Sequence, residues 1–190
     1  MRQDSEFRRQ AEQVQTEISK ALEAIDPAEV ENFIKAILKA KRIFLAGKGR
    51  TGLQMQAFAM RLMHLGLDVH VIGETSTPGV QPGDLLIIGS GSGKTGSLVA
   101  IAQAAKEHGP VLAAITANRE SVIAKAAEAH IFIPAPSHKK QDEEGIKSML
   151  PLGGLFEAAL GVALNVFVLW LMNDLGVTEV EMAARHANLE

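Results

Sequence analysis

Two glycine-rich segments are the parts of this sequence best suited to hold an anion. The first, Gly47–Gly52, reads Gly-Lys-Gly-Arg-Thr-Gly, and the second, Gly89–Thr95, reads Gly-Ser-Gly-Ser-Gly-Lys-Thr. Each follows a short apolar run and precedes a helical pattern, and at such a turn free backbone N–H groups and the helix dipole favour negative charge. We therefore expect the two loops to form a pocket for a phosphorylated sugar. Glycines that serve turn geometry alone are the alternative.

Both segments also resemble nucleotide-binding motifs. The first matches G-x-G-x-x-G, with Glu74 as a possible ribose partner, so a dinucleotide-dependent dehydrogenase is one alternative. The second fails the Walker A spacing, because Ile88 stands where that motif requires glycine, and ATP binding is not expected. Hydroxyl groups beside a lysine still suit a phosphate, and they are supplied by Ser90, Ser92 and Thr95 with Lys94.

The candidate acid–base residues lie outside these loops. Glu157 interrupts an apolar stretch that runs to Leu171, where a carboxylate must be paired, protonated or functional, unless it faces solvent or meets the helix dipole. His186 lies in a polar tail, where a solvated histidine is the usual interpretation. His64 faces either the core or the pocket, and Arg50 either clamps phosphate or pairs at the surface.

Elements that would position these groups follow from the hydrophobic periodicity. Strands are predicted over residues 43–46, 69–72, 85–88, 111–116 and 130–133, and helices over 5–24, 27–40, 51–65, 95–108 and 121–127, with two more beginning at Pro151 and after Thr178. This alternation predicts an α/β fold, a three-layer sandwich in which helices cover both faces of a five-stranded parallel sheet.

One domain is expected to span residues 1–190. Its predicted parts are N-terminal helices over 1–40, an α/β core with the phosphosugar loops over 41–134, a mobile loop over 135–150, and C-terminal helices with the tail over 151–190.

Composition removes several classes of function. The net charge is −3, so no overall field attracts nucleic acid or an acidic membrane. Cysteine is absent, which excludes disulfides and thiolate metal sites, and the histidines lack metal-ligand spacing, so no metal is expected. No targeting segment is visible, and the apolar stretch 155–171 is short for a membrane span, so we expect a buried core helix there and a cytoplasmic protein.

Several blocks make this sequence similar to the sugar isomerase (SIS) domain family, whose fold is flavodoxin-like or Rossmann-like. They are the first glycine loop, Phe58–Gly66, Gly73–Thr75, Pro151–Glu157 and the final Arg-His-Ala-Asn-Leu-Glu, residues 185–190. The resemblance extends from about Glu29 to the end of the chain. The glycine loops indicate only the family, whereas Met60–Gly66 and the tail resemble the members that interconvert D-arabino-3-hexulose 6-phosphate and D-fructose 6-phosphate.

The resemblance implies roles for individual residues. Thr51 stands where the family usually has a serine, Lys94 where many members have glutamate, and Gly154 where a serine or threonine is usual. Glu157 matches the family's proton acceptor, and His186 matches a tail histidine that reaches a neighbouring subunit's pocket in a tetramer. The predicted catalytic residues are Glu157, His186 and His64, and the predicted substrate- and phosphate-binding residues are Gly49, Arg50, Thr51, Ser90, Gly91, Ser92, Gly93, Lys94 and Thr95.

The implied reaction moves a carbonyl by one carbon through a cis-enediol, for which one carboxylate and one imidazole suffice without a cofactor. The expected partners are a phosphorylated sugar, other copies of the chain in a homotetramer, and, functionally, 3-hexulose-6-phosphate synthase of the ribulose monophosphate route for formaldehyde. Neither nucleic acid nor membrane is expected as a partner. Two alternatives remain besides the dehydrogenase: an isomerase of another phosphosugar, and a non-catalytic phosphosugar sensor, although no basic recognition helix precedes the first predicted strand.

Overall fold

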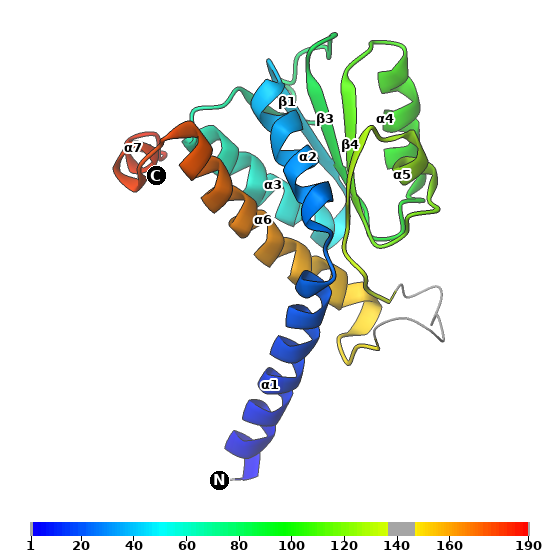
Figure 1. Cartoon of the computed structure of the whole chain (residues 1–190), viewed down its shortest axis with the longest axis vertical. Helices are drawn as coiled ribbons and strands as arrows, with labels where there is room; N and C mark the ends of the chain where they lie inside the picture. Colours follow the sequence, from blue (N-terminus) through cyan, green and yellow to red (C-terminus); the bar gives the residue numbers. More distant parts are fainter. Residues whose placement is uncertain (1, 137–146, 190) are drawn as a thin grey trace.

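The computed structural model describes residues 2–136 and 147–189. It confirms the predicted α/β class, with a five-stranded parallel sheet between layers of helices (Figure 1). The elements in chain order are α1 (Arg2–Glu23), α2 (Pro27–Lys39), β1 (Ile43–Gly47), α3 (Gly49–His64), β2 (Val69–Val71), β3 (Leu85–Gly89), α4 (Gly96–Lys106), β4 (Val111–Thr116), α5 (Val122–Ala126), β5 (Ala129–Phe132), a 3₁₀ turn (Pro151–Gly153), α6 (Gly154–Leu175) and α7 (Glu179–Ala184).

The strand order explains where a ligand can enter. The order is β2-β1-β3-β4-β5, so the chain reverses its direction of winding between β1 and β3. These two strands end in register, with Gly47 opposite Gly89. In open parallel sheets, ligands bind outside the carboxyl ends of the strands at such a reversal. Both predicted glycine loops begin at this point.

Alternating strand side chains build two cores, one on each face of the sheet. From β1, Ile43 and Leu45 pack on the face covered by α2, α3 and α6, while Phe44 and Ala46 pack on the face covered by α4 and α5 (Figure 1). The strand β3 is buried along its whole length, as expected for a central parallel strand.

The helix α6 is the longest apolar element. In the part of the chain that the structure describes, one helix, Pro151–Leu175, is long and apolar enough to cross a membrane by length and composition, but half of its most apolar window is buried inside the protein. Its inner face includes Phe156, Leu160 and Phe167, all within the core. This packing agrees with the prediction of a buried core helix.

The predicted helix boundaries are mostly confirmed, with one correction at α6. Asp26 caps α2 through the Ala28 N–H, and Thr178 forms a capping box with Glu181. Pro151, however, opens a 3₁₀ turn rather than the long helix. Leu152 has φ 57°, so the backbone leaves the right-handed helical region there and α6 begins at Gly154.

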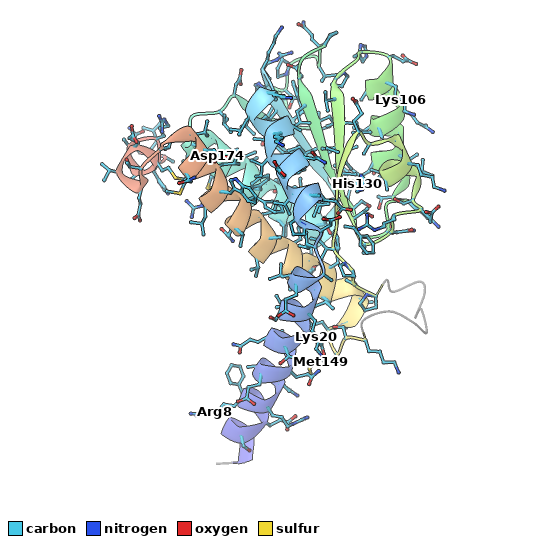
Figure 2. The ribbon with its side chains drawn as sticks, in the orientation of Figure 1. Arg8, Lys20, Lys106, His130, Met149 and Asp174 are labelled. Atoms are coloured by element: carbon cyan, nitrogen blue, oxygen red, sulfur yellow. The ribbon has the colours of Figure 1, made fainter. Side chains whose placement is uncertain are left out.

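The helix α1 binds the segment that leads into the 3₁₀ turn, through hydrogen bonds to residues 148 and 149. In Figure 1 its N-terminal half extends away from the rest of the protein. Its buried Glu17 accepts hydrogen bonds from the Ser148 hydroxyl (2.6 Å) and the Met149 N–H (3.3 Å), and Figure 2 shows Met149 beside this helix. Burial opposes ionisation, but these bonds hold the pKa of Glu17 below its ordinary value. Of the predicted mobile loop 135–150, residues 137–146 lie outside the described part.

Gly47 and Gly52 allow α3 to start directly against the end of β1. A Cβ added at Gly52 would lie 2.9 Å from the Gly47 carbonyl oxygen, and one added at Gly47 would lie 2.8 Å from the Gly52 Cα. No side chain fits between these two backbones. The first turn of α3 is therefore fixed close to the end of the neighbouring strand.

We predict that Gly52→Ala lowers the free energy of unfolding by about 1–3 kcal/mol, because a methyl group must push α3 away from β1. Urea denaturation measures this change. Gly96→Ala is the matched control, since a Cβ there meets nothing within 4 Å, and it should leave stability nearly unchanged. Equal stability of the two variants would contradict the close packing described here.

Candidate functional site

A cavity of about 320 Å³ lies at the carboxyl ends of β1 and β3, between the two glycine loops and the start of α6. Its volume lies at the lower end of the range for small-molecule sites. The residues that line it are Lys48, Gly49, Arg50, Thr51, Gly89, Ser90, Gly91, Ser92, Thr95, Leu98, Ala117, Pro136, Leu152, Gly153, Phe156 and Glu157.

The second glycine loop is held in shape by hydrogen bonds within the protein. The buried Ser90 hydroxyl accepts from the Gly93 N–H (3.1 Å) and lies 3.4 Å from the Thr95 hydroxyl. The Gly91 carbonyl accepts from the Ala117 N–H at 3.0 Å. Gly93 has φ +60°, and a Cβ there would come within 2.0 Å of the Ser121 hydroxyl. Ser90 and Gly93 thus shape the loop.

Ser92 is the serine of this loop that lines the cavity without being fully buried. Its hydroxyl accepts a weak hydrogen bond from the Lys94 N–H at 3.3 Å. The hydrogen of this hydroxyl is not used in that bond, and it can be donated to a phosphate oxygen, which is a stronger, charged acceptor.

Three helices begin at this cavity, and none of them has a side-chain cap. They are α3, α4 and α6, whose N-cap residues are Lys48, Thr95 and Gly153. By contrast, the first N–H groups of α2, α5 and α7 are capped by side chains of their own N-cap residues. Unsatisfied N–H groups and the positive ends of three helix dipoles therefore converge on one site, which favours a ligand carrying negative charge.

Glu157 and Arg50 face each other across the cavity. The Arg50 guanidinium donates a hydrogen bond from Nε to the Glu157 carboxylate and forms an ion pair with it. The Glu157 side chain is only 15 % exposed, whereas that of Arg50 is 81 % exposed. The carboxylate therefore has a fixed position, and the guanidinium can move away from it when a ligand enters.

Of the predicted site residues, eight line this cavity together: Gly49, Arg50, Thr51, Ser90, Gly91, Ser92, Thr95 and Glu157. Gly93 is buried within the second glycine loop and Lys94 is exposed, and neither residue lines the cavity. Glu74, the possible ribose partner, is exposed and is absent from the lining as well. The dehydrogenase alternative therefore lacks its predicted ribose partner, Glu74, in this cavity.

His64 and His186 lie together at a different place. His64 is the last residue of α3, and the His186 ring stacks on it with 5.2 Å between the ring centroids. The 16 residues of α3 separate this pair from the glycine loop by roughly 20 Å. Within one chain, neither imidazole shares the cavity with Glu157. Figure 1 shows the tail at the end of α6 farthest from the start of that helix.

Several lining residues were not among the predicted site residues. Lys48 had a signal in the sequence, because it lies inside the first glycine loop, whereas Phe156 and Leu152 had none that separates them from core residues. Leu152 is 86 % exposed and has a left-handed backbone conformation, which is rare for a leucine. Only the fold brings these side chains to the same cavity as the loops.

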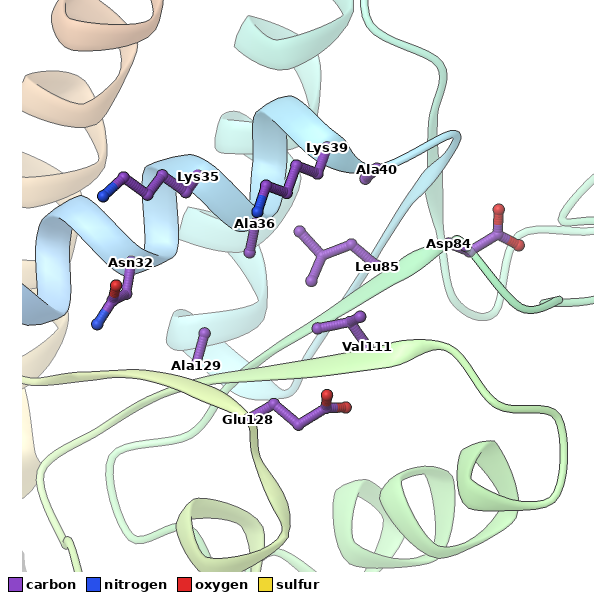
Figure 3. Close-up of a pocket in the computed structure, with 11 residues that line it drawn as sticks. Asn32, Lys35, Ala36, Lys39, Ala40, Asp84, Leu85, Val111, Glu128 and Ala129 are labelled. Carbon is purple, nitrogen blue, oxygen red and sulfur yellow. The ribbon is translucent and has the colours of Figure 1, made fainter.

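A larger cavity, about 500 Å³, lies at the amino ends of β3, β4 and β5, next to α2 (Figure 3). Its charged groups are partly committed to other contacts, since Lys35 pairs with Glu31 and Asp84 pairs with Arg42. No helix N-terminus without a cap faces it among the helices described above. Among the described residues, no group of three or more His, Asp or Glu side chains could hold a metal.

Comparison with known proteins gives concordant results. The SIS domain profile matches residues 36–159. The chain is 41 % identical to the 3-hexulose-6-phosphate isomerase of Bacillus subtilis (strain 168), over 94 % of this chain and 96 % of that protein. It is also 41 % identical to the enzyme of the same name from Mycobacterium gastri, over 93 % and 88 % of the two chains.

A solved structure supports the same grouping. A hypothetical protein from Methanococcus jannaschii superposes with a TM-score of 0.82 and 34 % identity, over 95 % of this chain and 98 % of that one. Its crystal structure was described as inferring a molecular function of 3-hexulose-6-phosphate isomerase.

We predict that Ser92→Ala and Ser90→Ala have different effects. Ser92→Ala should weaken the binding of inorganic phosphate about tenfold, through the loss of one hydrogen bond to a charged acceptor, and leave stability unchanged. Ser90→Ala should lower the free energy of unfolding by about 1 kcal/mol, because Gly93 loses a buried acceptor. Calorimetric titration and urea denaturation measure the two quantities. Ser97→Ala, on an exposed part of α4, is the control, and weaker phosphate binding by that variant would argue against the site.

Proposed function

The chain belongs to the SIS domain family, and we propose that it is a 3-hexulose-6-phosphate isomerase, also called 6-phospho-3-hexuloisomerase. It interconverts D-arabino-3-hexulose 6-phosphate and D-fructose 6-phosphate. The observation that carries the proposal is a poorly exposed carboxylate, Glu157, in a cavity where three uncapped helix N-termini meet. Relatives that share 41 % of the sequence over nearly the whole chain support this substrate.

The loop that precedes α4 holds the phosphate. Free N–H groups at the start of this helix, together with the hydroxyl groups of Ser92 and Thr95, supply hydrogen-bond donors for the phosphate oxygens. Lys48 adds a positive charge at the mouth of the cavity, and the Thr51 hydroxyl lies at the start of α3. Binding the phosphate at one end leaves the carbonyl end of the sugar to the residues of α3 and α6.

Glu157 acts as the enolising base. It removes the proton from C2 of the 3-ketose, and the electrons of the C–H bond form the C2–C3 double bond of a cis-enediolate, whose charge rests on the former carbonyl oxygen. The same group returns the proton to C3, and C2 becomes the carbonyl. The proton balance closes without a redox partner, since one hydrogen moves between adjacent carbons and another between their oxygens.

Arg50 has two successive partners in this scheme. Before the substrate enters, its guanidinium balances the charge of the Glu157 carboxylate. Because Arg50 is exposed, it can turn from the carboxylate to the substrate oxygen on which negative charge develops. This movement frees Glu157 to accept the carbon-bound proton at the moment when the guanidinium stabilises the enediolate.

His186 transfers the proton between the two oxygens, and it does so in the pocket of another subunit. The separation of roughly 20 Å along α3 keeps it from its own pocket. We propose a homotetramer, because exposed apolar side chains gather on the outer faces of α3 and α6, namely Leu53, Met60, Met63, Val162, Val166, Leu169 and Trp170. Faces of this kind are stabilised by a second copy of the chain.

The substrate places the enzyme after a 3-hexulose-6-phosphate synthase in the ribulose monophosphate route for formaldehyde. That functional coupling and a cytoplasmic location are part of the proposal, in keeping with the phosphorylated and therefore membrane-impermeant substrate.

We predict that Glu157→Gln lowers kcat at least a hundredfold while KM changes little, since the amide keeps the shape of the side chain but cannot accept the proton. The assay couples formation of fructose 6-phosphate from the 3-hexulose 6-phosphate to a colour reaction. Glu107→Gln, at an exposed carboxylate after α4, is the matched control and should retain wild-type kinetics. Near-normal turnover by Glu157→Gln would remove this residue from the base role.

We also predict that two inactive variants restore activity in mixed assemblies. When Glu157→Gln and His186→Ala chains are co-expressed in equal amounts, about a quarter of the pockets combine an intact Glu157 with an intact His186 from another chain. Activity of the purified mixed assemblies then recovers to about that fraction of wild type. Failure to recover any activity would show that the two residues do not meet across subunits.

A further inference from the structure

The C-terminal end of α3 is capped by an arginine from the far end of the chain. The last carbonyl groups of a helix lack partners within the helix. Here the Arg185 guanidinium donates from Nη1 to the carbonyl oxygen of His64 at 3.0 Å. The same nitrogen lies 3.3 Å from the carbonyl oxygen of Glu181, in α7. Arg185 therefore joins the end of α3 to the tail.

Gly66 provides the space for this guanidinium. It follows the end of α3 with φ +89°, which is the left-handed conformation usual for a glycine after a helix. A Cβ at this position would lie 3.3 Å from both the central carbon and a terminal nitrogen of the Arg185 guanidinium. The flat cation thus lies against a backbone surface that has no side chain.

His186 follows directly and packs on the same helix end. Its ring stacks on that of His64, with an interplanar angle of 21°. The His186 Nδ1 lies 3.2 Å from the carbonyl oxygen of Ala187, which can only accept a hydrogen bond. This nitrogen therefore carries the hydrogen in the neutral ring, and Nε2 is left with a free lone pair.

The ring on which His186 stacks, that of His64, favours its neutral form. It is almost fully buried, and its Nδ1 lies 3.4 Å from the Arg61 guanidinium, which can only donate. Burial, His186 and Arg61 all lower the pKa of His64. A neutral ring avoids repulsion when the second imidazole lies against it.

We propose that Arg185 and His64 are positioning residues for His186: together they hold its ring against the end of α3, with Nε2 free for proton transfer. This assignment rests on the proposed isomerase function, in which His186 works in a neighbouring pocket. It gives His64 a role through His186 instead of the direct catalytic role predicted from the sequence.

The fold of α7 does not itself depend on Arg185. The Thr178–Glu181 capping box and the buried Met182 hold this helix in place, and both precede Arg185 in the chain. Loss of the guanidinium therefore releases the residues that follow, above all His186, while α7 stays docked.

A double-mutant cycle on turnover tests the proposal. Arg185→Ala should lower kcat roughly ten- to a hundredfold with KM unchanged, because Arg185 is not one of the groups that bind the phosphate. Once His186→Ala has been introduced, adding Arg185→Ala should lower kcat no further. Arg185→Lys should restore part of the activity, since an ammonium group can still donate to the His64 carbonyl. Lys125→Ala, in an exposed ion pair with Glu120, is the control and should leave kcat unchanged.

The outcome that overturns the proposal is an equal loss from Arg185→Ala in the wild-type and His186→Ala backgrounds. A second readout does not depend on activity. In ¹⁵N-resolved NMR spectra of the imidazoles, the wild-type His186 should show a protonated Nδ1 and a bare Nε2, and Arg185→Ala should average the two tautomers. An unchanged His186 spectrum in Arg185→Ala overturns the positioning role. A wild-type enzyme with this spectrum but without isomerase activity would contradict only the proposed function.

Discussion

The contact between two glycines, Gly47 and Gly52, is the constraint from which the site follows. With no Cβ at either residue, α3 begins against the end of β1, and its N-terminal N–H groups lie beside the end of β3. Gly89 extends the same constraint to the next strand, because a Cβ there would come within 2.6 Å of the Met55 sulfur. A larger side chain at any of these positions would push the helix from the sheet and widen the anion site.

The electrostatics of the cavity depend on three helix N-termini that have no side-chain cap. Three helices, α2, α5 and α7, satisfy their first N–H groups with a side chain of their own, but the three that begin at the cavity do not. Their free donors are available to a ligand, and the cost of leaving them uncapped is offset when a phosphate or an enediolate binds. Arg50 and Glu157 add one charge of each sign, so the site balances its own charge before the substrate enters.

The length of α3 divides the catalytic groups between two places. Its first turn belongs to the phosphosugar cavity, and its last turn supports the two imidazoles. A rigid helix cannot bring its two ends together, so the proposed reaction needs a second copy of the chain. The apolar outer faces of α3 and α6 lie between these two ends and offer the surface through which such copies associate.

The sequence by itself determined the class of fold, the strand-to-helix position of both glycine loops, and the helix starts after Asp26 and Thr178, because these depend on local periodicity and turn chemistry. It also identified half of the residues that line the cavity, since loops at the ends of adjacent parallel strands must meet. Tertiary structure decided what depends on contacts between distant segments: the pairing of Arg50 with Glu157, the capping of α3 by Arg185, and the stacking of His186 on His64. Such contacts join residues more than one hundred positions apart, and spacing along the chain carries no information about them.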